Sequence, residues 1–273
     1  MDPRLEALPA RYTIEREVGR GGSSRVYVAI DSANGQRVAI KVLHPELAGS
    51  VSALRFQREV RVLTSLEHPG ILPVLDSAVV GNALFYVMPY LDGTTLLQRL
   101  ASEGALPYAE VVEIVRVLAS AIDYAHSRNV VHRDIKPANV LFDGARPVIA
   151  DFGIARAIIA ASSESGVSSS GLAIGTPLYM SPEQSLDPNH VDGRADIYSL
   201  GCIAFEMLSG RPPFTGATSM AILAKHVSET PPLVTRYRSD VPPQAATAIA
   251  AAMAKEPRAR PKTASALAQL MSA

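Results

Sequence analysis

The hydrophobic pattern of this 273-residue chain changes near Asp92-Gly93, and that change limits the folds it can adopt. Before this point, apolar runs between polar turns predict an antiparallel meander with strands at 12–18, 25–30, 38–43, 71–80 and 83–88. A helical period interrupts the strands over 52–66. After it, we expect helices over 96–101, 108–128, 193–208, 219–229, 243–254 and 263–271. This order predicts an α+β fold of two lobes, a small sheet with one helix and then a mainly helical part.

Composition excludes several classes of function. Lysine plus arginine and aspartate plus glutamate number 26 each, so the formal net charge is 26 − 26 = 0, and we expect no nucleic-acid partner. Cys202 is the single cysteine, so no disulfide forms within the chain and a reducing compartment fits. The most apolar C-terminal stretch, around 245–254, is too short to cross a bilayer, and we expect no direct membrane contact by this segment.

A glycine-rich turn at 19–24, Gly-Arg-Gly-Gly-Ser-Ser, lies between two predicted strands. Glycines let backbone N–H groups approach phosphates without a Cβ in the way. A plain hairpin turn explains the string equally well. The turn is neither a P-loop nor a dinucleotide fingerprint, because no Gly-Lys-Ser/Thr follows and no helix begins there.

Lys41 ends the apolar strand that begins at Val38. A lysine at this point can reach phosphate oxygens, and Glu59 on the next predicted helix can pair with it. Lone lysines at strand ends are more often solvent-exposed, and Glu59 lies between Arg58 and Arg61, which offer ordinary surface pairing.

The string His132-Arg133-Asp134-Ile135-Lys136-Pro137-Ala138-Asn139 is far more specific. It supplies a carboxylate for a hydroxyl, a cation for a phosphate and an amide oxygen for a metal within one short loop. Asp151-Phe152-Gly153 follows, and the Asp151 carboxylate suits Mg²⁺. Alone, Asp-Phe-Gly would be read as a turn, but behind this loop it indicates phosphoryl transfer.

Together these strings resemble the protein-kinase superfamily, from about residue 12 to residue 271. The resemblance includes Gly175-Thr176-Pro177-Leu178-Tyr179-Met180-Ser181-Pro182-Glu183, the string from Asp192 to Gly201, and Arg260. It looks like the bacterial serine/threonine branch, many of whose members are cytoplasmic domains of membrane receptors. It implies a bilobal fold, with an N-lobe at 1–88, a hinge at 89–92 and a C-lobe at 93–273. It also implies a cytoplasmic location, and leaves open a homodimer and further domains after residue 273.

By this resemblance, the chain transfers the γ-phosphoryl of Mg-ATP, with Mn²⁺ as a substitute metal, to serine or threonine hydroxyls of proteins. Asp134 would be the catalytic base, and Lys136 would steady the γ-phosphate. Lys41 would bind the α/β-phosphates and pair with Glu59, while Thr176 would bridge Asp134 and Lys136. The residues implied to hold metal are Asn139 and Asp151, and those implied as structural supports are Glu183, Asp196 and Arg260.

The resemblance also assigns the nucleotide contacts. Gly19, Arg20, Gly21, Gly22 and Ser23 would cover the phosphates, with Ser24 at the position of a third glycine. The residues implied to sandwich adenine are Val26, Ala39 and Leu141. In the hinge, the carbonyl of Pro89 and the N–H of Leu91 would bond adenine, and Met88 would limit the pocket behind it.

The resemblance also implies a mode of regulation, which is based on the arginine directly before Asp134. Arg133, with Arg55 and Arg156, matches a basic pocket that binds a phosphate on the activation loop, which would order that loop. Ser168 and Ser170 are the predicted acceptors of autophosphorylation. A solvated serine-rich loop is the alternative interpretation.

Three rival functions remain. A pseudokinase usually lacks the counterparts of Lys41, Asp134 or Asp151, and all three are present. Kinase-like enzymes for small molecules normally lack the 175–183 segment and the Arg260 element. A purely structural helical protein would not need Asp134, Asn139 and Asp151 together.

Overall fold

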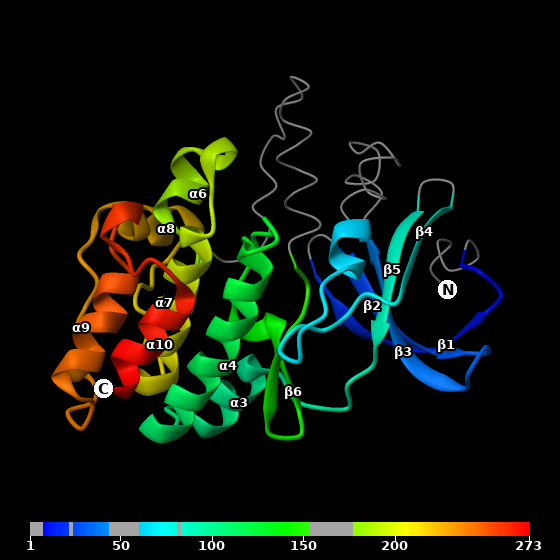
Figure 1. Ribbon diagram of the computed structural model, residues 1–273, viewed down its shortest axis with the longest axis horizontal. Helices are drawn as coiled ribbons and strands as arrows, with labels where there is room; N and C mark the ends of the chain where they lie inside the picture. Colours follow the sequence, from blue (N-terminus) through cyan, green and yellow to red (C-terminus); the bar gives the residue numbers. More distant parts are fainter. Residues whose placement is uncertain (1–7, 22–23, 44–59, 81–82, 153–176) are drawn as a thin grey trace. The chain divides into compact units, whose positions relative to one another are not determined.

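The computed structural model describes residues 8–21, 24–43, 60–80, 83–152 and 177–273. The chain divides into two compact units. The first takes in Met1–Glu67, Leu72–Leu91 and Ile154–Gly175, and the second His68–Ile71, Asp92–Gly153 and Thr176–Ala273. The α+β prediction is confirmed, since the first unit carries a sheet and the second is mainly helical (Figure 1).

The first unit is built on a five-stranded antiparallel sheet in the order β1-β2-β3-β5-β4. Its strands are β1 (Tyr12–Arg20), β2 (Ser24–Asp31), β3 (Gln36–Leu43), β4 (Asp76–Val80) and β5 (Ala83–Pro89). Within the predicted 52–66 helix, residues 60–64 are helical and 52–59 lie outside the described residues. The strand expected over 71–80 begins only at Asp76, because Pro73 has no N–H to give to a ladder.

One face of this sheet is the core of the unit. Tyr27 pairs with Ile40, and Ile40 with Val87, so these side chains share a face. All three are buried in one apolar cluster. The register therefore leaves alternate residues of β2, β3 and β5 on the opposite face.

The second unit contains most of the helices. Its α-helices in the described residues are α3 (Leu96–Glu103), α4 (Tyr108–His126), α6 (Pro182–Leu186), α7 (Arg194–Ser209), α8 (Ser219–Ser228), α9 (Pro243–Ala252) and α10 (Ala264–Ser272). Single 3₁₀ turns lie at Pro137–Asn139, Pro188–His190, Val234–Arg236 and Pro257–Ala259. A hairpin of β6 (Val140–Asp143) and β7 (Arg146–Ile149) lies between the helices expected at 108–128 and 193–208, where no strand was predicted.

Helix α7 is the centre of the second unit. Every residue from Ala195 to Leu208 is buried, which suits a helix that packs against α4, α9 and α10 (Figure 1). A Cβ on Gly201 would lie 2.8 Å from the Cβ of Ala252, so glycine permits the close approach of α9. Burial also raises the pKa of the Cys202 thiol in this helix.

The N-termini of the outer helices are capped by side chains. Thr95, Thr218 and Thr263 accept N–H groups at the starts of α3, α8 and α10. Asp123 of α4 accepts the N–H groups of Ala264 and Ser265 at 2.8 and 2.9 Å, which ties α10 to α4. Within the described ranges, no helix has the length and hydropathy of a membrane span.

Candidate active site

The predicted nucleotide contacts of the first unit share the sheet face opposite its core. Val26 pairs with Lys41, and Ala39 pairs with Met88. Ala39 and Lys41 are two residues apart on β3, so all four side chains point to the same side. Gly19 pairs with Val26 and extends this row to β1. The residues of this row are among those that the sequence predicted to contact adenine and the α/β-phosphates.

The glycine-rich turn and the hinge flank this row. Gly21 donates its N–H to Ser24 O at 2.9 Å and closes the β1–β2 connection, whereas Gly22 and Ser23 lie outside the described residues. Arg20 is paired with Glu17 at 2.9 Å. Pro89 is the last residue of β5, and Leu91 follows two residues later, so the predicted hinge begins where the sheet ends.

The loop at 132–139, which we call the catalytic loop for its predicted role, brings together the side chains of Asp134, Lys136 and Asn139. Lys136 Nζ donates to Asp134 Oδ2 at 2.7 Å. Asn139 Nδ2 donates to the Asp134 carbonyl at 2.8 Å and to Asp134 Oδ2 at 3.1 Å. A 3₁₀ turn at Pro137–Asn139 folds the loop back so that residue 139 reaches residue 134. The Asp134 and Lys136 side chains keep exposed fractions of 28% and 34%, so this polar cluster is accessible to a ligand.

The Asn139 amide is oriented as a metal ligand would require. Both of its contacts to Asp134 are to acceptors, so only the NH₂ group can face them and Oδ1 points away. Mg²⁺ takes one or two protein oxygens together with phosphate and water, so Asn139 and Asp151 form a sufficient donor set. The described residues contain no cluster of three or more His, Cys, Asp or Glu side chains placed to hold a metal ion.

Asp151 is placed beside this loop by backbone contacts. Ala150 donates its N–H to the Asn139 carbonyl at 2.9 Å, so the following residue is held near residue 139. Asp151 has a φ of 62°, a left-handed conformation that residues other than glycine rarely adopt. Such a conformation costs about 1–3 kcal/mol and persists only where the surroundings impose it, which is typical of functional positions.

His132 packs beneath the loop as a neutral side chain. Burial lowers the pKa of His132 in spite of the nearby carboxylates of Asp196, Asp134 and Asp151. Its Nδ1 accepts the N–H of Asp134 at 3.1 Å, so Nε2 carries the hydrogen and donates to Ala150 O at 3.1 Å. Its ring contacts Phe152 with centroids 4.6 Å apart. His132 therefore joins the catalytic loop to the Asp151 segment.

Asp196 holds the backbone of the catalytic loop from α7. It is 1% exposed and accepts the N–H of Arg133 at 2.8 Å on Oδ1 and the N–H of His132 at 2.8 Å on Oδ2. His126 Nε2 contacts Oδ2 at 2.8 Å and supplies a third partner. A Cβ on Gly193 would lie 2.6 Å from the His126 ring, so glycine is required for this approach.

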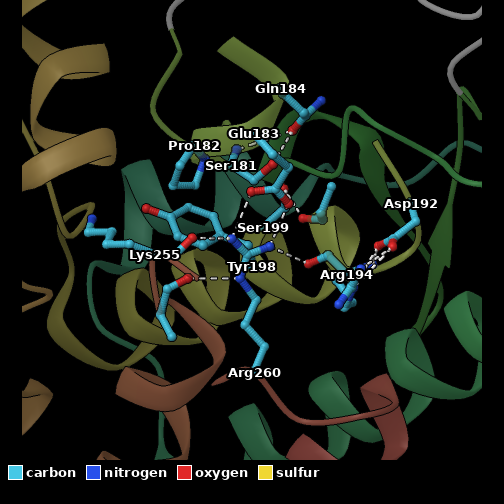
Figure 2. Close-up of polar contacts among 12 residues, drawn as sticks. Ser181, Pro182, Glu183, Gln184, Asp192, Arg194, Tyr198, Ser199, Lys255 and Arg260 are labelled. Atoms are coloured by element: carbon cyan, nitrogen blue, oxygen red, sulfur yellow. Dashed lines mark hydrogen bonds and ion pairs between the residues drawn. The ribbon is translucent and has the colours of Figure 1, made fainter. Parts of the chain in front are cut away.

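Glu183 and Arg260 form a buried pair that fixes α6. Arg260 Nη1 and Nη2 donate to the two Glu183 oxygens at 2.6 and 2.8 Å (Figure 2). The remaining donors of Arg260 go to the carbonyls of Ala254, Arg194 and Lys255. All five N–H groups of the guanidinium are thereby used, and its plane lies over Tyr198 with 4.9 Å to the ring centroid.

The segment that leads into Glu183 is held by further polar contacts. Tyr179 donates its hydroxyl to Glu206 Oε2 at 2.5 Å, and Ser199 donates to Tyr179 O at 2.7 Å. Burial raises the pKa of both Tyr179 and Glu206. The chain from residue 177 to residue 184 is therefore fixed to α7 and to the Arg260 loop.

Several predicted residues lie outside the described part of the chain. They are Gly22, Ser23, Arg55, Glu59, Arg156, Ser168, Ser170 and Thr176. Leu141 is described and lies on β6 in the second unit, where it pairs with Val148.

Sequence reasoning missed two residues that the structure brings to the site and a third, Lys255, beside the Glu183–Arg260 pair. Gln184 contacts Ser181 and the Arg133 carbonyl, and the Ser-x-x-Gln spacing of a capping box was the signal available for it. His126 contacts Asp196, and Lys255 donates to the carbonyls of Lys225 and His226 at the end of α8. Nothing in the local sequence of His126 or Lys255 pointed to these contacts.

Comparison with known proteins agrees with this geometry. Residues 12–271 match the protein kinase domain family. The chain is 38% identical over 263 residues to serine/threonine-protein kinase PknB of Mycolicibacterium smegmatis, covering 94% of this chain and 42% of that protein. It is 37% identical over 249 residues to the probable serine/threonine-protein kinase PknB of Lactococcus lactis, covering 90% and 39%.

A solved structure shows the same fold. The crystal structure of Rad53 1-466 in complex with AMP-PNP superposes with a TM-score of 0.78 at 26% identity, covering 94% of this chain and 64% of that one. The chain spans about two fifths of the length of the PknB proteins that it matches. It belongs to the protein kinase family, on the branch of the bacterial serine/threonine kinases.

Proposed function

We propose that this chain transfers the γ-phosphoryl of ATP to serine and threonine hydroxyls of proteins. The observation that carries the proposal is the loop in which Lys136 and Asn139 both bond Asp134 Oδ2, at 2.7 and 3.1 Å. A carboxylate held in this way can orient the attacking hydroxyl and take its proton. The adjacent ammonium group can stabilise charge on the transferred phosphoryl group.

The phosphates and adenine are assigned to the row on the first sheet. Lys41 would bind the α/β-phosphates, with Glu59 as its proposed partner, and Gly19, Arg20, Gly21, Gly22 and Ser23 would cover them. Val26 and Ala39 would contact one side of adenine and Leu141 the other, with Met88, Pro89 and Leu91 at its edge. The shared sheet face of Val26, Ala39, Lys41 and Met88 supports this assignment. We keep 1–88, 89–92 and 93–273 as the proposed lobes and hinge.

Asn139 and Asp151 are the proposed ligands of a divalent cation, with Mg²⁺ preferred and Mn²⁺ as a substitute. When bound, the cation neutralises charge on the phosphates. The chain's part would be to present the Asn139 oxygen, which lies on the side of the amide away from the two Asp134 acceptors, and the Asp151 carboxylate.

Acceptor binding and regulation are assigned to the segment before Glu183. Thr176 would bridge Asp134 and Lys136 and help to seat the acceptor. A phosphate on Ser168 or Ser170 would bind Arg133, Arg55 and Arg156 and order the loop. Autophosphorylation between two copies would require a transient homodimer, and the single cysteine suits work in the reducing cytoplasm.

The test is transfer of labelled phosphate from Mg-ATP to a generic basic protein. Wild type is compared with Asp134→Asn and with Asp143→Asn, an exposed aspartate paired with Arg146. We expect label on serine or threonine that is lost in Asp134→Asn and kept in Asp143→Asn. ATP binding without transfer would favour a pseudokinase, and transfer to an aminoglycoside or choline in place of protein would favour a small-molecule kinase.

A further inference from the structure

The peptide group between Arg133 and Asp134 is held at both of its polar atoms. Its carbonyl accepts a hydrogen bond from Gln184 Nε2 at 2.7 Å. Its N–H, which belongs to Asp134, donates to His132 Nδ1 at 3.1 Å. The orientation of this peptide sets the direction in which the Asp134 side chain leaves the backbone.

The hydrogen bonds of Gln184 fix which side of its amide is the oxygen and which is the nitrogen. Its Oε1 accepts the backbone N–H of Ser181 at 3.1 Å and the Ser181 hydroxyl at 3.2 Å. Its Nε2 faces an acceptor, the Arg133 carbonyl, so only a donor fits there. Figure 2 shows Gln184 beside Ser181 at the start of α6.

The peptide needs this restraint because of the backbone before it. Arg133 has a φ of 64°, in the left-handed region that non-glycine residues avoid. Its N–H is held by Asp196 at 2.8 Å, and its side chain donates to Val191 O at 3.2 Å. The carbonyl is the other polar group of the Arg133 backbone, and Gln184 supplies its partner from a different segment.

Helix α6 is a firm support for that contact. Glu183, the residue before Gln184, is bonded to Arg260, whose side chain is fully enclosed. Ser181 is fully buried, and its hydroxyl donates a hydrogen bond to Oε1 of the Gln184 amide. A displacement of α6 would therefore be transmitted to the carbonyl of Arg133.

We propose that Gln184 is a positioning residue for phosphoryl transfer, which orients Asp134 by holding the Arg133–Asp134 peptide. The inference rests on the proposed function. It makes the end of the 177–184 segment a direct support of the catalytic carboxylate, through one side-chain amide.

The decisive variant is Gln184→Glu. A carboxylate can still accept both bonds from Ser181, as in a Ser-x-x-Glu capping box, but it places an acceptor against the Arg133 carbonyl. We expect kcat to fall about 10- to 100-fold, because a misplacement of about 1 Å can cost that much. The KM values for ATP and for protein should stay within about two-fold, since neither binding surface is altered.

Two further variants separate positioning from folding. Gln184→Ala removes the cap as well and should lower both kcat and the melting temperature. Ser185→Ala, an exposed neighbour on the same helix whose hydroxyl bonds only Pro182 O among the described contacts, should match wild type in both. A Gln184→Glu variant with wild-type kcat, or one whose loss is confined to KM, would overturn the inference.

The pH dependence of kcat distinguishes a hydrogen-bond donor role of residue 184 from a purely structural role. The carboxyl introduced by Gln184→Glu becomes a donor when it is protonated. We therefore expect the ratio of variant to wild-type kcat to rise as the pH falls from 8 toward 5.5. A ratio independent of pH contradicts the proposed donor role.

Amide exchange tests the inference without any activity assay. In wild type the Asp134 amide should exchange slowly, and in Gln184→Glu it should exchange faster at unchanged global stability. Equal exchange in the two proteins would overturn the positioning role, whereas absence of transfer by wild type would overturn the proposed function.

Discussion

Arg260 donates both terminal nitrogens to the two carboxylate oxygens of Glu183, and its side chain is 0% exposed. The pair joins α6 to the loop before α10 across 77 residues of chain. Three backbone carbonyls complete the arginine's contacts, so it has no exposed donor left to satisfy.

Breaking this pair should strongly destabilise the second unit. Arg260→Met leaves Glu183 largely buried without its cation and three carbonyls without donors, which should cost about 3–5 kcal/mol of unfolding free energy. Denaturant unfolding of Arg260→Met, Glu183→Gln and the double variant would measure it. Arg258→Met, at an exposed position two residues away, is the control. Purely additive single effects would argue against a coupled pair.

Loss of the Asp196 carboxylate should loosen the catalytic loop. Asp196→Asn places an NH₂ group against backbone N–H donors, and an unsatisfied buried donor costs about 1–3 kcal/mol. Amide exchange at His132 and Arg133 should accelerate. Asp192→Asn, at an exposed carboxylate paired with Arg194 nearby, should change stability by less than about 1 kcal/mol. Unchanged exchange in Asp196→Asn would refute this anchor.

Asn139 should control the metal requirement. Asn139→Ala removes the amide oxygen proposed as a metal ligand and the two donor bonds to Asp134. We expect the Mg²⁺ concentration for half-maximal transfer to rise about 10- to 100-fold, the usual effect of losing a ligand or its support. A Mg²⁺ titration at saturating ATP checks it. Asn189→Ala, at an exposed position in the Pro188–His190 turn, is the control, and an unaltered Mg²⁺ dependence of Asn139→Ala would exclude a role in metal binding.

Acid should destabilise the fold through His226. This side chain is fully buried, and burial, with the charge of Lys255, lowers its pKa to about 4 from 6.5. Between pH 4 and pH 6.5, His226 is protonated in the unfolded chain and neutral in the folded chain. The free energy of unfolding therefore falls as the pH drops from 6.5 toward 4, by up to about 3 kcal/mol. Burial lowers the pKa of His132 as well, so this residue also makes the fold less stable as the pH falls.

His226→Asn isolates that contribution. Tyr198 O–H lies 2.7 Å from His226 Nδ1, and the asparagine oxygen can accept from the same hydroxyl without titrating. The difference in unfolding free energy between pH 7 and pH 5 should therefore be smaller in the variant than in wild type. An identical pH dependence would mean that other groups, such as the carboxylates, account for the whole effect.

The order of strands and helices was predictable because it depends on the spacing of apolar residues within each short segment. The polar turn around Ser32–Gln36 and the apolar runs beside it gave β2 and β3, and α7 was visible as a long apolar segment. The β6–β7 hairpin was missed, since strands of four residues carry too little alternation to be recognised. The late start of β4 depended on Pro73, whose effect on a strand is clear only once its ladder partner is known.

The site was predictable where its residues are close in sequence. Asp134, Lys136 and Asn139 lie within one loop, and the structure joins them directly. His126 is 70 residues from Asp196, and Gln184 is 51 residues from Arg133, so no local pattern could pair them. The left-handed backbone of Arg133 and Asp151 was equally invisible, because arginine rarely adopts it and most aspartates, although more tolerant, do not.

The burial of Cys202 gives the chain a built-in reporter. It is the single cysteine of the sequence, lies wholly inside α7, and has a pKa raised by that burial, so the native thiol resists alkylating reagents. The rate at which Cys202 is alkylated therefore reports how often α7 and the helices packed around it open to solvent. A second cysteine placed on the surface would be labelled alone under native conditions, and a fluorophore or spin label could be attached there without first removing the natural thiol.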